Sequence, residues 1–368
     1  MHVVVLGGGY AGVLLVRALE RSLPAGVSLT LVDERETHLV QHLVHQAVRK
    51  PALAERLTVS FDRLCSRADH RRTRVTNLDR ETRTVETTAG PLSYDICAVC
   101  LGARTAFYGL DGVETHATPL KRLDDAATIR ERFERVRERG GRVVVGGAGL
   151  SGVQVAGELA ELAAGTDAEV VLVEQAGTVA PGFSGPFQTA IADELADLDV
   201  DIWPNRTVTG ATADELELDR GTVAYDQLVW TGGITGRDAL GGRERVRATL
   251  RRGDRVFVLG DAARVVDAEG AVVPATAQTA IGQAETAATN VTRLVEHRHS
   301  GDGFEPRLAR YRYDPKGWVV SVGDSTVATL GGAVVRGAPA HLLKTTIGSG
   351  YLGSIGAVSD AVRYALSV

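Results

Sequence analysis

Cysteine and long apolar runs are scarce in this chain of 368 residues. Three cysteines, Cys65, Cys97 and Cys100, are too few for a disulfide framework and favour a reducing compartment. No run approaches the roughly 20 apolar residues that cross a bilayer, because four glycines interrupt the best candidate, residues 3–16. The chain starts directly with an apolar strand and shows no secretory leader. The sequence therefore predicts a cytoplasmic protein that is not integral to the membrane.

A strong charge of one sign is also absent. The net charge is −5, with 44% hydrophobic and 24% charged residues, which is ordinary for a globular protein and predicts no nucleic-acid partner. Lysine occurs four times, at positions 50, 121, 316 and 344, whereas arginine is abundant, which we attribute to nucleotide composition. The arginine-rich stretches 71–74 and 130–142 are interpreted as solvated faces, because most of the charges alternate in sign; attraction to anionic lipid is the alternative.

Two distant segments, residues 3–19 and 142–159, share one pattern of apolar strand, glycine-rich turn and amphipathic helix. The turns follow the spacing G-x-G-x-x-G, with Gly7, Gly9 and Gly12 in the first and Gly147, Gly149 and Gly152 in the second. In such a turn the first glycine permits the tight geometry, the second leaves room for a pyrophosphate, and the third lets the helix pack closely on the strand. The phosphates then lie at a helix N-terminus. The sequence therefore predicts two dinucleotide-binding units.

An acidic residue completes each unit. Asp33 and Glu174 each end an apolar strand about 20 residues beyond the last glycine of the turn, where a carboxylate meets a ribose hydroxyl. Glu174 is followed by Gln175 and Ala176 and not by arginine, so a 2′-phosphate would meet a negative charge without a neighbouring cation in the sequence. The second unit therefore favours NADH over NADPH.

A third apolar strand, residues 255–259, closes on Gly260 and Asp261. Ligands of parallel sheets bind at the carboxyl ends of the strands, so we expect Asp261 to meet the ribityl or pyrophosphate part of a flavin. An ordinary turn at the end of a strand is the alternative. Two dinucleotide units in one chain indicate one tightly held cofactor and one that exchanges.

The order of these motifs resembles that of the flavoproteins with two dinucleotide-binding domains, and most closely the type II NADH dehydrogenases (NADH:quinone oxidoreductases). The segments that carry the resemblance are GGGYAG at 7–12, VDERETHLVQHLVHQAV at 32–48, YDICAVCLGART at 94–105, GAGLSGVQVAGELAEL at 147–162, YDQLVWTGG at 225–233, VFVLGDAA at 256–263 and PATAQTAIGQAETAATNV at 274–291. Residues 313–332 are similar to the C-terminal strands of that family. The likeness covers nearly the whole chain.

The resemblance implies that hydride passes from NADH to N5 of FAD and that the electrons leave to a quinone without proton pumping. The residues implied to hold FAD are Gly7, Gly9, Tyr10, Ala11, Gly12, Asp33, Glu34, His38, Val75, Gly102, Arg104, Gly260, Asp261, Ala277 and Gln278. Those implied to hold NADH are Gly147, Gly149, Leu150, Ser151, Gly152, Glu174, Thr231, Gly232 and Gly233. Such chemistry belongs to the cofactors, so we expect positioning and electrostatics from the protein, and no nucleophile or triad.

The implied catalytic residues are Gln154, Gln278 and Gln283, and two of them depart from the family pattern. The family usually has Glu at the position of Gln154. Its A-Q-x-A-x-Q motif is met here by residues 277–283 with the second glutamine, Gln283, displaced by one, which on a helix rotates a side chain by about 100°. Two alternatives to a quinone reductase therefore stay open. One is a soluble NADH:acceptor reductase that serves a ferredoxin, heme or dye, and the other is an NADH-sensing flavoprotein similar to apoptosis-inducing factor.

Cysteine and histidine clusters offer two further hypotheses. Cys97 and Cys100 form C-x-x-C but lie three apart on an expected strand, facing opposite sides, so we expect buried structural cysteines and no dithiol. His38, His42 and His45 have the spacing of one helix face, which would suit a metal. No cysteine or acidic ligand accompanies them, so we expect no metal, and a packed or proton-relaying histidine face instead.

The sequence predicts an α/β fold with two Rossmann-like dinucleotide-binding domains, similar to glutathione reductase. The FAD domain would comprise residues 1–112 and 247–304, the inserted NADH domain residues 113–246, and a C-terminal segment residues 305–368. Residues 338–368 are apolar and weakly charged, and we expect an amphipathic helix that contacts the membrane surface on the cytoplasmic side. Packing against its own domain, or against a second subunit in a homodimer, is the alternative.

Overall fold

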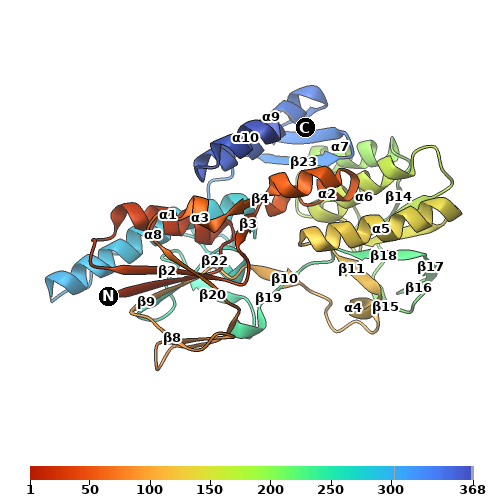
Figure 1. Cartoon of the computed structure of the whole chain (residues 1–368). Coiled ribbons are helices and arrows are strands. Elements are labelled where there is room, and N and C mark those ends of the chain that lie inside the picture. Colours follow the sequence, from red (N-terminus) through yellow and green to blue (C-terminus); the bar gives the residue numbers. More distant parts are fainter. Residues whose placement is uncertain (302, 366–368) are drawn as a thin grey trace.

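Two five-stranded parallel sheets form the frame of the protein (Figure 1). The computed structural model describes residues 1–301 and 303–365, so the end of the predicted C-terminal segment, residues 366–368, lies outside the described residues. The first sheet has the order β21-β9-β1-β2-β5. Its strands are β21 (Val256–Val258), β9 (Ile96–Val99), β1 (His2–Leu6), β2 (Ser28–Asp33) and β5 (Asp69–Arg72).

The inner strands of the first sheet are buried on both faces, whereas the edge strand β5 is largely exposed. The apolar run of β1 is fully buried from Val3 to Leu6, as expected for the central strand of a parallel sheet. Two helices, α1 (Tyr10–Ser22) and α8 (Ala277–Ser300), pack against each other over one face. A three-stranded meander lies on the other side, formed by β6 (Val75–Asp79), β7 (Thr84–Thr87) and β8 (Leu92–Ser93).

The second sheet repeats the first with the order β11-β18-β12-β13-β14. Its strands are β11 (Ala117–Pro119), β18 (Gln227–Trp230), β12 (Arg142–Gly146), β13 (Glu169–Val173) and β14 (Asp201–Trp203). Helices α5 (Leu123–Arg139) and α6 (Leu150–Ala163) pack on one face. The other face forms a separate apolar cluster with the meander of β15 (Val208–Ala211), β16 (Glu215–Leu218) and β17 (Gly221–Ala224).

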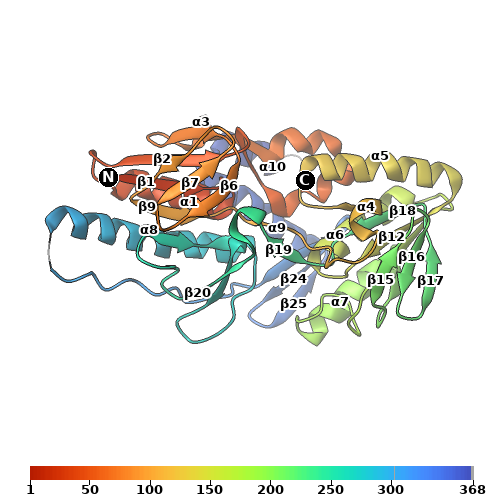
Figure 2. The same ribbon diagram turned by 90° about the horizontal axis from the view of Figure 1, so that it is seen from below.

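The two sheets lie at opposite ends of an elongated molecule (Figure 2). Between them β10 (Ala103–Thr105) pairs antiparallel with β19 (Ile234–Gly236), so two strands join the halves. Near this connection β20 (Glu244–Arg247) pairs in parallel with β22 (Ala263–Val266). The remaining short elements before the C-terminal segment are β3 (Thr37–Leu39), η1 (Gln41–Leu43), α2 (Gln46–Arg49), η2 (Pro51–Leu57), β4 (Thr58–Ser60), α3 (Phe61–Leu64), α4 (Val113–His116), α7 (Gly185–Ala196), η3 (Asp238–Leu240) and η4 (Gly260–Ala262).

The C-terminal segment forms a small layer across both halves (Figure 1). Strands β23 (Trp318–Val322), β24 (Ser325–Leu330) and β25 (Ala333–Arg336) form an antiparallel sheet that packs on α6 and α7. Helices α9 (Ala338–Ser354) and α10 (Val358–Ala365) follow. Among the helices of the described residues, none combines the length and apolar character needed to cross a membrane.

The prediction that three histidines share one helix face is wrong. His38 lies on β3, which pairs with β4, His42 lies in η1, and His45 directly precedes α2. Strand pairing therefore overrides the helical spacing here.

The cysteine prediction is confirmed, since Cys97 on β9 and Cys100 just after it are buried and unpaired, and burial raises the pKa of both thiols.

Candidate functional site

The two glycine turns have nearly identical geometry. Gly7 and Gly147 take positive φ angles of 97° and 96°, which favour glycine. A Cβ on Gly12 would lie 1.8 Å from the carbonyl oxygen of Gly7, and one on Gly152 would lie 1.8 Å from that of Gly147. The first and third glycines of each turn are therefore required by the backbone itself.

The middle glycines face open space. A Cβ on Gly9 or on Gly149 would meet nothing within 4 Å. These residues precede α1 and α6, which begin at Tyr10 and Leu150 without a side-chain cap or an acidic residue in the first turn. The first backbone N–H groups of each helix, including those of Ala11 and Ser151, thus have no partner within the helix and suit an anion.

One carboxylate supports each turn from the neighbouring strand. Asp33 accepts a hydrogen bond from the Gly8 N–H at 2.7 Å, and Glu174 accepts one from the Ala148 N–H at 2.7 Å. The second oxygen of each accepts from the N–H two residues further on, at 2.9 Å from Arg35 and 2.8 Å from Ala176. Both carboxylates are therefore fixed beside the turn, at the carboxyl end of a parallel strand.

A cavity of about 430 Å³ opens at the carboxyl ends of β2 and β5. It is lined by Glu34, Arg35, Arg72, Thr73, Arg74 and Thr88. Glu34 is held by Arg74 at 2.8 Å and Arg122 at 2.9 Å. The half-buried Val75 directly follows the lining residue Arg74. This cavity adjoins Asp33 and suits the adenosine end of a dinucleotide.

The Gly-Asp motif packs against the first turn. A Cβ on Gly260 would lie 3.3 Å from that of Ala11, so η4 and the start of α1 are in contact. Gln283 is buried and accepts the Gly260 N–H at 2.7 Å. Arg243 donates to the carbonyl oxygens of Asp261 and Ala263, both at 2.8 Å. The structure thus brings the first glycine turn and the Gly260-Asp261 motif together. The side chain of Gln283 is used to bind the backbone of η4 at Gly260.

Four other predicted residues lie on or beside neighbouring elements. Gly102, after β9, has a φ of 67°, and Arg104 on β10 donates to Asp238 at 2.8 Å. Ala277 begins α8, where Thr276 caps the helix by accepting from the Thr279 N–H at 3.1 Å. Gln278, in the first turn of α8, is half-buried.

The strand end after β18 packs against the second turn. The Thr231 hydroxyl lies 3.1 and 2.8 Å from the carbonyl oxygens of Gly146 and Gly147 and donates to them. A Cβ on Gly147 would lie 2.8 Å from the Cα of Gly232, and Gly233 has a φ of 147°. Close backbone packing therefore accounts for small residues here.

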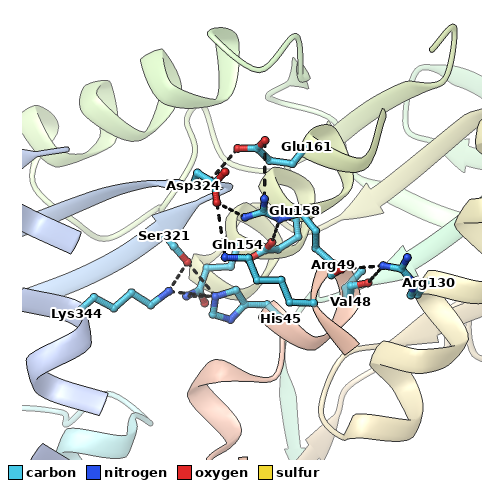
Figure 3. A network of polar contacts seen from close by, with 11 residues as sticks. His45, Val48, Arg49, Arg130, Gln154, Glu158, Glu161, Ser321, Asp324 and Lys344 are labelled. Carbon is cyan, nitrogen blue, oxygen red and sulfur yellow. Dashed lines mark hydrogen bonds and ion pairs between the residues drawn. The ribbon is translucent and has the colours of Figure 1, made fainter. Parts of the chain in front are cut away.

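Gln154 lies in a buried polar cluster, which we name the Lys344 cluster: His45, Gln154, Ser321 and Lys344 (Figure 3). Lys344 Nζ is 3.2 Å from His45 Nε2 and also donates to the Ser321 hydroxyl. The Ser321 hydroxyl in turn donates to His45 Nε2 at 2.9 Å, and the Gln154 amide lies 3.4 Å from that nitrogen. Because the Lys344 ammonium and the Gln154 amide nitrogen can only donate, His45 Nε2 is an acceptor and the ring is neutral.

Burial sets the charges in the Lys344 cluster. It lowers the pKa of Lys344 to about 7, although the nearby carboxylate of Glu158 acts in the opposite direction. Burial also lowers the pKa of His45 well below its usual range, and the charge of Lys344 adds to this effect. Gln154 contributes an uncharged amide to the cluster, so the carboxylate that acts on the pKa of Lys344 is that of Glu158.

An ion-pair network adjoins the cluster one helical turn away (Figure 3). Arg49 binds Glu158 at 2.7 Å and Asp324 at 2.5 Å. Glu158 is only 2% exposed, and burial raises its pKa although Arg49 acts against this. The network joins α2, α6 and the β23–β24 turn, so it fixes the C-terminal layer over both halves.

Sequence reasoning missed Lys121, Glu158, Ser321 and Lys344. Burial lowers the pKa of Lys121, and the carboxylate of Asp261 acts in the opposite direction, so the charges of these two residues interact. The scarcity of lysine was a usable signal, since two of the four lysines lie at the site and Lys344 stands in an apolar tail. Across residues 1–301 and 303–365, no group of three or more metal-binding side chains is close enough to hold a metal ion.

Comparisons with known proteins agree with this geometry. The pyridine nucleotide-disulphide oxidoreductase family matches residues 1–284. The type II NADH:quinone oxidoreductase of Staphylococcus epidermidis is 26% identical over 98% of this chain and 97% of its own length. Its counterpart in Staphylococcus aureus is 25% identical with the same coverage.

Solved structures share the fold. NDH2 from Plasmodium falciparum in complex with NADH superposes with a TM-score of 0.84 and 15% identity, over 99% of this chain and 97% of that one. The sulfide:quinone oxidoreductase of Aquifex aeolicus gives a TM-score of 0.79 and 16% identity, over 98% and 92%. At these identities the likeness concerns the fold.

Proposed function

The chain belongs to the pyridine nucleotide-disulphide oxidoreductase family, and from that premise we propose that it is an FAD-dependent NADH:quinone oxidoreductase that does not pump protons. The observation that carries the proposal is the repetition of one anion-binding turn on two parallel sheets, each supported by its own carboxylate. The full-length similarity to proteins named type II NADH:quinone oxidoreductase supports the choice of reaction.

FAD belongs to the first turn in this proposal. The open space at Gly9, the N–H groups that begin α1 and the cavity beside Asp33 fit a pyrophosphate followed by adenosine. When bound, FAD supplies the hydride acceptor N5 and the one- or two-electron chemistry of its ring. The chain contributes position and charge: Asp261 follows Gly260, which contacts Ala11 in α1, and the charge of Lys121 interacts with that of Asp261.

NADH belongs to the second turn. Glu174 is fixed beside the ribose position, and its negative charge disfavours the 2′-phosphate of NADPH. We propose that residues 231–233, which pack closely against the second turn, border the nicotinamide end. Parallel-sheet ligands bind at the carboxyl ends of the strands, which are the ends that carry both turns.

On the acceptor side we propose different roles for the three glutamines. Gln154 and Gln278 are half-buried and can contact nicotinamide, flavin or acceptor. Gln283 is bound to Gly260 and would act as a positioning residue for the flavin motif. Lys344, with a pKa near 7, is suited to supply a proton when the acceptor is reduced.

We propose an FAD domain of residues 1–112 and 247–304, an NADH domain of residues 113–246, and a C-terminal segment from residue 305. The separate parallel sheets and the β10–β19 connection support this division.

We further propose that α9 and α10 rest on the cytoplasmic face of the membrane, because Leu342, Ile347 and Val362 are 69%, 47% and 55% exposed. A homodimer contact through the same face is the competing proposal.

Steady-state NADH oxidation with different acceptors tests the proposal. We expect turnover to rise strongly when a soluble quinone is added, and to stay low with ferredoxin alone. Turnover with ferredoxin or heme but not with quinone would favour a soluble reductase. Absence of turnover with every acceptor, in protein that still binds NADH, would favour a sensing role.

A further inference from the structure

The C-terminal helix α9 reaches the first glycine turn through a single histidine. His38 Nδ1 lies 2.9 Å from the carbonyl oxygen of Gly8, and His38 Nε2 lies 2.8 Å from the hydroxyl of Tyr351 on α9. His38 is fully buried and Tyr351 is 7% exposed. Two hydrogen bonds therefore connect residue 8 with residue 351, and Figure 1 shows α9 and α10 on the same side of the molecule as α1.

The direction of these hydrogen bonds is fixed by their chemistry. The Gly8 carbonyl can only accept, so His38 Nδ1–H donates to it. Burial lowers the pKa of His38 to about 4, and the ring is neutral at ordinary pH. His38 Nε2 must then accept, and the Tyr351 hydroxyl donates. Removal of that hydroxyl would leave a buried acceptor without a partner.

Aromatic packing surrounds this chain of hydrogen bonds. The rings of Tyr10 and Tyr351 have centroids 4.7 Å apart, and Tyr10 and His38 meet edge to face at 5.4 Å. The Tyr10 hydroxyl lies 2.5 Å from His42 Nδ1. Because Tyr10 is the first residue of α1, the start of the anion-binding helix and α9 share one packed cluster.

The peptide between Gly8 and Gly9 links this aromatic cluster to the anion site through its orientation. In a trans peptide the C=O and the following N–H point in opposite directions. His38 holds the Gly8 carbonyl, so the N–H of Gly9 is directed away from His38. Gly9 is the position where an added Cβ would meet open space, and where the pyrophosphate is expected.

From this geometry we propose that Tyr351 is a positioning residue for FAD, and that FAD binding and docking of α9 stabilise each other. The inference rests on the proposed binding of FAD at the first turn. Coupling of this kind is reciprocal: a contact that orders the turn raises FAD affinity, and bound FAD then favours the docked helix. Because α9 also carries Lys344 and the exposed Leu342, flavin occupancy would be linked to the acceptor side of the enzyme.

The test uses flavin-free protein reconstituted with FAD. Tyr351→Phe keeps the ring and removes the hydroxyl, and the Kd for FAD is measured from the quenching of flavin fluorescence. We expect it to rise about fivefold, the factor that corresponds to one buried hydrogen bond. Tyr225→Phe is the matched control, because it removes a tyrosine hydroxyl bonded to the Thr212 carbonyl in the meander of the second sheet. The control should keep the wild-type Kd.

A second measurement needs no variant. Amide hydrogen exchange of residues 338–354 in the wild-type protein should slow when FAD is added, whereas exchange of residues 215–224 in the distant meander should not change. An unaltered Kd in Tyr351→Phe together with unchanged exchange of α9 would overturn the inference. Wild-type protein that binds no FAD at all would instead refute the proposed function, so the two failures are distinguishable.

Discussion

Lys344 is a buried amine whose ionisation links stability to pH. In the unfolded chain it keeps its proton up to about pH 10.5, but burial lowers its pKa to about 7 in the folded protein. The cost of burying its charge is therefore complete below about pH 7 and disappears as the pH rises toward 10.5. Lys344 contacts His45 and Ser321, Gln154 contacts His45 in turn, and the charges of Glu158 and Lys50 also act on the pKa of Lys344.

Lys344→Met should consequently stabilise the protein near pH 6, because it replaces the buried charge with an apolar chain of similar length. The gain in the free energy of unfolding should shrink as the pH rises toward 10. Urea denaturation across this range measures it, with Lys50→Met, an exposed lysine near Asp324, as the control. A stability difference that stays constant with pH would contradict the assignment of the low pKa to Lys344.

Glu174 is expected to set the choice between NADH and NADPH. Glu174→Gln keeps an oxygen that can accept the Ala148 N–H but removes the negative charge at the ribose. The ratio of kcat/KM for NADH to that for NADPH should fall about tenfold, which corresponds to ~1.4 kcal/mol. Asp33→Asn, the same change at the first turn, should leave this ratio unaltered. An unchanged ratio in Glu174→Gln would rule out its role in selecting the coenzyme.

Residue-level prediction succeeded where partners are close in sequence and failed where they are distant. The glycines and the carboxylates of both turns lie within one strand–turn–helix–strand unit, so their spacing identifies them. Lys344 and His45 are 299 positions apart, and no local pattern brings them together. Gln283 illustrates a second limit, because its displacement in the motif does not reveal that it binds Gly260.

At the scale of elements, the paired units were predictable and the segment 37–49 was not. Periodicity identified the strands and helices around each turn because one apolar strand and one amphipathic helix repeat in the same order. The three histidines have helical spacing, yet residues 37–39 pair with residues 58–60 as a small antiparallel sheet. The same strand places His38 beside Gly8, a contact between distant positions that sequence spacing does not encode.

The α9 surface carries a prediction about membranes. Replacing Leu342 and Ile347 together with serine removes two exposed apolar side chains, so partitioning to lipid vesicles should fall at least about tenfold. Cosedimentation with vesicles measures this. A double change of Val272 and Phe304 to serine is the control, because these side chains are 78% and 94% exposed elsewhere on the surface. Equal sedimentation of the two double variants would contradict a membrane contact. If the Leu342 and Ile347 variant instead lost a dimer that the wild-type protein forms, the α9 surface would be assigned to a second subunit.

At the scale of the whole molecule, one folding unit is used twice for two tasks. Both sheets place a glycine turn, a helix N-terminus and a carboxylate in the same arrangement. The surroundings differ: the first turn is packed against η4 and linked to α9 through His38, whereas the second contacts the short segment after β18. A turn enclosed from several sides suits a resident cofactor, and one with fewer covering elements suits a coenzyme that exchanges.

The absorbance of bound flavin before and after anaerobic addition of NADH, compared between Gly9→Val and Gly149→Val, tests this division of tasks most directly. Both positions have ordinary extended backbone angles and open space around them, so each variant should fold. We predict that Gly9→Val is purified without FAD, and that Gly149→Val keeps its FAD but is no longer reduced by NADH. Flavin loss in Gly149→Val, or full reduction by NADH in Gly9→Val, would contradict the assignment of FAD to the first turn and NADH to the second.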